Sequence, residues 1–96
     1  MIDLQHLQTF LAVAITGNFR RAAAELGYSQ PSVTHHIQVL ERELGVSLFE
    51  RSRFSRLAVL TPSGHRVLQY SERLLALAAE THAAARAEAC ERAIKS

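Results

Sequence analysis

The sequence lacks the features that mark several common classes of protein. Its single cysteine, Cys90, excludes an intramolecular disulfide and fits a reducing compartment. No apolar run approaches the roughly 20 residues that span a bilayer, and the N-terminus has no basic region followed by an apolar one. Neither a membrane helix nor a signal peptide is predicted, and we expect a cytoplasmic protein.

The spacing of the histidines and the cysteine does not suit metal binding, and the sequence shows no arrangement typical of catalysis. The five histidines and Cys90 show no CxxC or HxxxH spacing, and His35 and His36, being adjacent, face different ways on a helix. No nucleophile–base pair or glycine-rich phosphate loop is visible, and 96 residues are too few to enclose an active site. We therefore expect no metal, no cofactor and no enzymatic activity.

What the sequence does contain is a pattern of two helices joined by a tight turn, from residue 19 to residue 45. The first helix follows Asn18, a good N-cap, and ends at Gly27. The second follows Ser29, carries Pro31 in its first turn, and ends at Gly45. A short glycine-containing turn between two helices is typical of the helix-turn-helix motif.

The second of these helices has two distinct faces. At about 100° per residue, one stripe is apolar and is predicted to be buried: Val33, Ile37, Leu40 and Leu44. The opposite face is polar and rich in hydrogen-bonding groups: Pro31, His35, Gln38 and Arg42, with Thr34 on its flank. A polar outer face of this kind is suited to the DNA major groove, so the sequence predicts DNA binding.

The rest of the chain completes a small head and adds a long helix. A first helix between Asp3 and Gly17 is predicted to bury Leu4, Leu7, Leu11 and Ile15, widened by Phe10 and Ala14. Residues 48–60 read as two short strands around an arginine-rich centre, a β-hairpin wing. Thr61 and Pro62 then start a helix of about 30 residues, on the order of 45 Å long, which the head is too small to cover. Its apolar stripe must meet something apolar: Val67, Leu68, Ser71, Leu74, Leu75, Ala78 and Thr81 to His82.

Together these residues resemble the N-terminal winged helix-turn-helix of LysR-type transcriptional regulators. The resemblance covers residues 1 to about 68 by motif and the long helix to about 90 by type. Its most continuous parts are Gly17-Asn18-Phe19, Ala22-Ala23, Ser29-Gln30-Pro31-Ser32-Val33-Thr34, Leu40-Glu41, Leu44-Gly45 and Leu60-Thr61-Pro62-Ser63-Gly64.

The resemblance implies a mainly α fold, with a winged helix-turn-helix head (1–61) followed by a long linker and dimerisation helix (62–94). It also implies a bacterial homodimer that binds promoter DNA at an interrupted dyad. In full-length members a small-molecule-sensing domain follows, and we expect this chain to be the DNA-binding part without that domain. Two departures from the family pattern bear on base preference: the pair His35-His36, and a wing about two residues longer than usual.

Candidate site residues follow from these patterns and from the resemblance. Base contacts are expected from the start of the recognition helix (about 30–44): Gln30, Pro31, Thr34 and His35. Contacts with the DNA backbone are expected from Arg20, Arg21, Ser29, Ser32, Gln38, Arg51, Arg53 and Arg56. The dimer interface is expected at Val67, Leu68, Leu74, Leu75 and Ala78.

Plainer alternatives stay open for several of these residues. The outer face of the recognition helix and the wing arginines can simply be solvated, and Arg21 can pair with Glu25 four residues on. Arg42 can face phosphate or solvent. At the level of function, the alternatives are a winged-helix module that contacts protein and a winged-helix regulator of another family. A protein-contact module would favour acidic or apolar residues on the outer face, which this chain does not have there.

Overall fold

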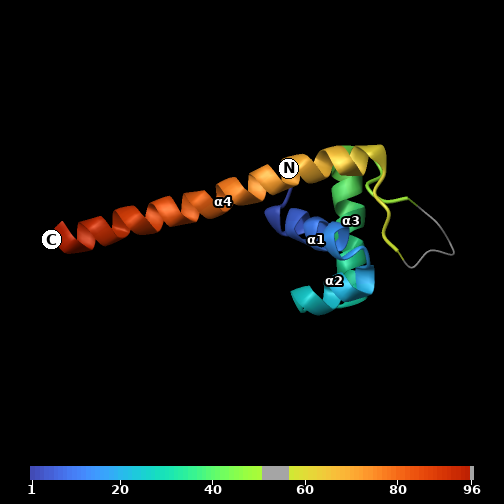
Figure 1. Cartoon of the computed structure of the whole chain (residues 1–96), viewed down its shortest axis with the longest axis horizontal. Coiled ribbons are helices and arrows are strands. Elements are labelled where there is room, and N and C mark those ends of the chain that lie inside the picture. The colour runs from blue at the N-terminus through green and yellow to red at the C-terminus, as the bar shows by residue number, and fades with distance from the viewer. Residues whose placement is uncertain (51–56, 96) are drawn as a thin grey trace.

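The computed structural model describes residues 1–50 and 57–95, and side-chain surroundings as far as residue 90. Within these residues four helices follow one another (Figure 1). They are α1 (Leu4–Thr16), α2 (Phe19–Leu26), α3 (Gln30–Leu44) and α4 (Pro62–Lys95). α1 packs against all three others, whereas α3 and α4 do not pack against each other.

The helix boundaries are set by local chemistry, as predicted. The N-cap oxygens accept hydrogen bonds from backbone N–H groups two or three residues on, at 2.8–3.2 Å. These N-caps are Asp3, Asn18, Ser29 and Thr61. α1, α2 and α3 each end at a glycine in the left-handed conformation: Gly17, Gly27 and Gly45 (φ 69°, 73° and 71°).

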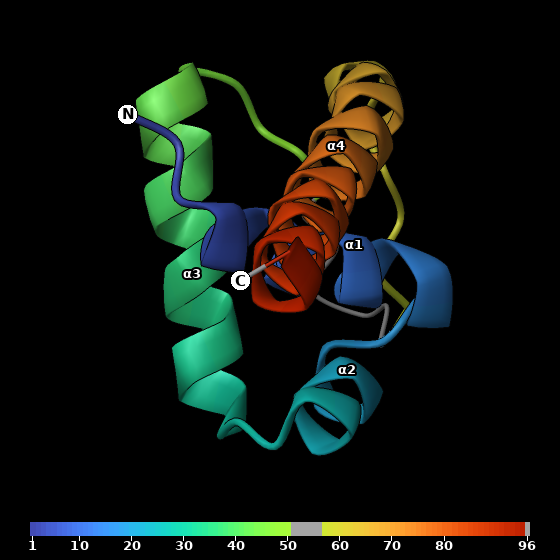
Figure 2. The ribbon, with the colours of Figure 1, turned by 90° about the vertical axis from the view of Figure 1, so that its left-hand side faces the viewer.

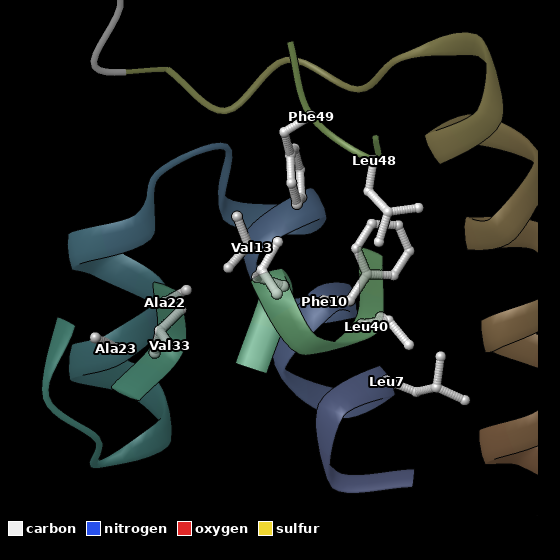
Figure 3. Packing of buried hydrophobic residues seen from close by; sticks show 10 residues of the cluster. Leu7, Phe10, Val13, Ala22, Ala23, Val33, Leu40, Leu48 and Phe49 are labelled. Atoms are coloured by element: carbon white, nitrogen blue, oxygen red, sulfur yellow. The ribbon is translucent and has the colours of Figure 1, made fainter. Parts of the chain in front are cut away.

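The core lies between the three head helices and the segment after α3, and Figure 3 shows nine of its side chains labelled. Its buried members are Leu7, Phe10, Val13, Ala22, Ala23, Val33, Ile37, Leu40, Leu48 and Phe49. Phe49 joins α1 and α2, because its ring centroid lies 5.5 Å from that of Phe10 and 5.4 Å from that of Phe19. The predicted buried stripe of α3 is confirmed, with Leu44 packed at its edge.

The prediction for α1 is partly wrong. Leu4 and Ile15 are 45% and 73% exposed, whereas Val13, absent from the predicted stripe, is buried. α2 and α3 cover the side of α1 that carries Phe10 and Val13, so the buried arc is centred there. Leu4 and Ile15 lie about 60° and 80° round the helix from Leu7, beyond the edge of that arc.

The wing has an antiparallel base. Phe49 and Leu60 form an antiparallel bridge. Glu50 N donates to Val59 O at 2.7 Å, and Thr61 N donates to Leu48 O at 3.0 Å. Within the described residues this bridge stands in place of the two predicted strands. The predicted backbone contacts Arg51, Arg53 and Arg56 lie outside the described residues.

The long helix α4 rests on the head only through its first half. Figure 2 looks almost along α4 and shows α1 directly behind it. Ser71 is buried at this contact, and its hydroxyl donates to Val67 O at 2.8 Å. From residue 79 to residue 90 every residue is exposed. α4 therefore projects well beyond the head, and the chain measures 61 × 25 × 19 Å along its principal axes (Figure 1).

Candidate nucleic-acid interface

The predicted recognition face lies at the surface of the head. α3 turns its buried stripe toward α1 and α2, which leaves the opposite face without protein contacts from the other helices. The exposed predicted residues here are Ser29, Gln30, Pro31, Ser32, His35 and Gln38, and Arg42 is exposed beyond them. Thr34 is half-buried at the flank of this face.

The start of α3 is ordered by a pair of hydroxyl groups. Ser29 Oγ accepts from Ser32 N at 3.2 Å and lies 2.8 Å from Ser32 Oγ. Both side chains are exposed beside the N-terminus of a helix, where the aligned peptide dipoles favour negative charge. This end of α3 therefore suits a phosphate or the electronegative edge of a base.

The two arginines at the start of α2 are both exposed. Arg21 Nε lies 3.7 Å from Glu25 Oε1, so the ion pair weighed against a phosphate contact does form. Because both side chains are mostly in solvent, this pair is weak and can open to meet a phosphate. Arg20 has no ion-pair partner among the described residues.

The two adjacent histidines of α3 lie in different surroundings, as their spacing predicts. His35 points to solvent on the recognition face, whereas His36 is half-buried toward α1. His36 Nδ1 lies 2.9 Å from the hydroxyl oxygen of Thr9, a residue that is fully buried. Burial of the ring, together with His6 and His35, lowers the pKa of His36 below its ordinary value of 6.5, and Asp3 opposes this shift.

A contact that the sequence did not predict joins the end of α3 to the base of the wing. Glu41 Oε2 accepts from Leu48 N at 2.7 Å and from Ser47 Oγ at 3.2 Å. Thr61 Oγ1 donates to Ser47 O at 2.6 Å from the other side. The only sequence signal was the Leu40-Glu41 pair, which carries no indication of the partner seven residues on.

An open cleft of about 520 Å³ lies where α3 meets the segment leading to the wing. Its lining consists of Gln38, Glu41, Arg42, Gly45, Val46 and Ser47. Gln38 and Arg42 also belong to the outer face of α3, so the polar recognition face continues into this cleft. In the parts of the chain that the structure describes, no three potential ligands are grouped to hold a metal ion, and no helix is long and apolar enough to cross a membrane.

Comparison with known proteins identifies the family. Residues 4–65 match the family described as "Bacterial regulatory helix-turn-helix protein, lysR family". The chain belongs to this family. Its relatives are transcriptional regulators rather than enzymes, and the matched residues run from α1 through the wing to the first turn of α4.

Curated relatives extend the match along α4. The chain is 46% identical over 78 residues to the "Probable RuBisCO transcriptional regulator" of Trichormus variabilis, and 41% identical over 79 residues to that of Cyanophora paradoxa. These alignments cover 81% and 82% of this chain. The chain spans about a quarter of the length of these relatives, 23% and 24% respectively.

Solved structures match the same architecture. The DNA-binding domain of CbnR, in a complex with DNA, is 42% identical with a TM-score of 0.84, covering 91% of this chain and 98% of that one. The DNA-binding domain of BenM, in a complex with benA site 1 DNA, is 38% identical with a TM-score of 0.85, covering 91% and 96%. This chain is thus a winged helix-turn-helix domain of the LysR type.

Proposed function

We propose that this chain binds double-stranded DNA sequence-specifically at promoter sites, with α3 in the major groove. The observation that carries the proposal is the outer face of α3, which is exposed, polar and free of acidic side chains from Gln30 to Gln38. Support comes from the related CbnR and BenM domains, whose structures contain DNA. A protein-contact role fits less well, because this face offers neither acidic groups nor large apolar ones.

The roles of the base-contacting residues follow from their chemistry. The Gln30 amide can pair with the N6 and N7 edge of adenine. Pro31 and the methyl group of Thr34 can contact a thymine methyl, and His35 can donate to a guanine acceptor. Because the first turns of a recognition helix reach deepest into the groove, these four residues are the proposed determinants of sequence.

Residues around these four are proposed to hold the DNA backbone. In the described part of the chain they are Arg20, Arg21, Ser29, Ser32 and Gln38, all exposed. The wing arginines named above complete the proposed set. Each phosphate that a cation neutralises releases counterions and steepens the salt dependence of binding.

We further propose a homodimer formed through α4, with residues 1–61 as the head and 62–94 as the linker helix. Of the five interface residues predicted, Val67, Leu68 and Leu75 pack against the core of their own head, and Ala78 is half-buried. Leu74 is exposed, and it shares the open side of α4 with Tyr70 and Leu77. This open apolar side is the better candidate for the partner helix, and two heads so joined would read the two halves of a dyad.

The remaining parts of the proposal concern the regulator to which this domain belongs. Cytoplasmic location follows from the need to reach promoter DNA. Regulation by a small molecule is proposed to act through a sensing domain outside these residues, as the family resemblance implies.

The decisive experiment is selection of binding sites from random duplex DNA at near-physiological salt. We expect an enriched, interrupted motif with two-fold symmetry. Gln30→Ala should then relax one base position at a cost of about 1–3 kcal/mol, because a bidentate base contact is lost. Gln69→Ala, exposed on α4, is the matched control and should leave the motif unchanged. Binding that shows no enriched motif and disappears as salt rises would reduce the function to a nonspecific electrostatic contact.

A further inference from the structure

Two imidazole rings are in contact, with their planes tilted, where the recognition helix packs on α1. The centroids of His6 and His36 are 4.7 Å apart, with an angle of 34° between the ring planes. A third ring, Tyr28, makes a T-shaped contact with His36, with centroids 5.4 Å apart and 82° between the ring planes. His6 comes from α1, Tyr28 from the turn before α3, and His36 from α3 itself.

Hydrogen bonds tie these three segments together. Tyr28 Oη accepts from Gln5 Nε2 at 2.7 Å, so the turn is held to α1. Thr9 Oγ1 donates to Gln5 O at 3.1 Å and lies 2.9 Å from His36 Nδ1. With the hydroxyl proton donated to Gln5, the Thr9 oxygen accepts from His36 Nδ1–H, and Nε2 is the unprotonated nitrogen of the neutral ring.

Burial and the neighbouring His6 ring favour the neutral form of His36. Nδ1 of His6 is buried and has no hydrogen-bond partner among the described residues, so a proton there would bury an N–H without an acceptor. Two protonated rings in this contact would also repel each other. Asp3 opposes this preference, because its Oδ2 lies 4.0 Å from His6 Nε2, whereas His35 on α3 acts in the same direction as His6.

We propose that the His6–His36 pair is a proton-sensitive clasp that, while neutral, holds the recognition helix on α1. Proton uptake opens this contact and loosens the head. The loss of DNA binding that follows rests on the proposed function, whereas the loosening of the fold does not. The segment most affected is the start of α3, because Tyr28 lies two residues before Gln30.

The direction of the pH effect follows from linkage. The pKa of His36 is lowered in the folded state, so below the ordinary value of 6.5 the unfolded chain binds more protons than the folded one. The contribution of His36 to stability is therefore complete above pH 6.5 and falls as the pH drops toward the lower folded pKa.

The test compares three proteins, each the 96-residue chain: the native sequence, His36→Gln and His35→Gln. Urea unfolding is followed by circular dichroism between pH 8 and pH 5.5, without DNA. Below pH 6.5 the unfolding constant of the native chain should rise by up to about tenfold per pH unit for one proton taken up. His36→Gln should lose this component, because the amide can still donate to Thr9 but does not titrate. His35→Gln should retain most of it, because burial and His6 are larger causes of the lowered pKa than His35. Equal pH slopes in all three proteins would overturn the proposal.

Two further measurements keep the proposal falsifiable and separate it from the proposed function. If His36→Gln does not fold, proton NMR titration of the native chain takes its place, and a His36 ring that titrates at or above pH 6.5 overturns the clasp.

Binding to the duplex recovered by selection is measured at pH 7.5 and 5.5 in equal salt. The affinity of the native chain for this duplex should fall at pH 5.5, and that of His36→Gln should not. A clasp seen in unfolding without DNA binding at either pH would contradict only the proposed function. Binding at pH 7.5 without a His36-dependent unfolding slope would contradict only the clasp.

Discussion

At Gly64 the absence of a single methyl group allows α4 to begin against the base of the wing. Gly64 is buried, and a Cβ built there would collide with the carbonyl oxygen of Leu48. That oxygen is backbone and already accepts from Thr61 N at 3.0 Å, so it has little freedom to move. The first turn of α4 and the wing base are thus fitted to each other at one residue.

Gly64→Ala is therefore expected to destabilise the domain by about 1–3 kcal/mol, the usual cost of overpacking. The sign of this change in stability tests the contact, because glycine-to-alanine in a helix with free space would stabilise the domain by up to about 1 kcal/mol. Chemical denaturation followed by circular dichroism measures the difference. His65→Ala, at the exposed neighbouring position, should stay within about 0.5 kcal/mol of the native chain. A stabilised Gly64→Ala would show that the contact between α4 and Leu48 is looser than described.

At the scale of the elements, Glu41 joins α3 to the wing base. Its carboxylate accepts from both Leu48 N and Ser47 Oγ, so Glu41→Ala leaves a part-buried backbone N–H without its partner. We expect a loss of about 1–3 kcal/mol in the free energy of unfolding. Glu41→Gln keeps an acceptor oxygen and should lose less. Glu43→Ala removes only a surface pair with the N-terminus, at 3.7 Å, and should cost less than about 1 kcal/mol. Equal losses at Glu41 and Glu43 would contradict the role of Glu41.

The elements also show which features could be predicted from the sequence. The helix boundaries could be predicted, because an N-cap such as Ser29 and a left-handed Gly27 act on backbone groups within a few residues. The buried face of α1 could only be predicted in part, since it depends on where α2 and α3 pack. The contacts of His36 with His6 and Thr9 span about 30 residues of sequence and have no local signal.

The recognition face was predictable for a different reason. The buried stripe of α3 could be recognised from its apolar spacing, and on an amphipathic helix the polar face opposite the buried stripe faces solvent. The exposure of Pro31, His35 and Gln38 therefore followed once Val33 and Ile37 were assigned to the core. Which of these side chains contacts which base is set by the DNA, and it stays a prediction.

On the scale of the whole molecule, the open side of α4 leads to a prediction about assembly. Tyr70, Leu74 and Leu77 are 55%, 43% and 60% exposed on a helix whose other side already packs on the head. Leu77→Glu should raise the dissociation constant of the proposed dimer at least tenfold, about 1.4 kcal/mol, by placing a charge in an apolar contact. Sedimentation equilibrium measures this constant. Ala76→Glu adds the same charge on another side of α4 and should leave it nearly unchanged. The same effect from both variants would place the interface elsewhere.

The projection of α4 has a mechanical consequence. With 34 residues it is about 51 Å long, and it touches the head only through its first half, as far as Ala78. The part beyond Ala78 is therefore a lever arm that begins where the contact with the head ends. A tilt of about 5° there moves the end of the helix, about 25 Å away, by about 2 Å. In a dimer, a small change in how each head sits on its α4 would become a large change in the spacing between the two recognition helices.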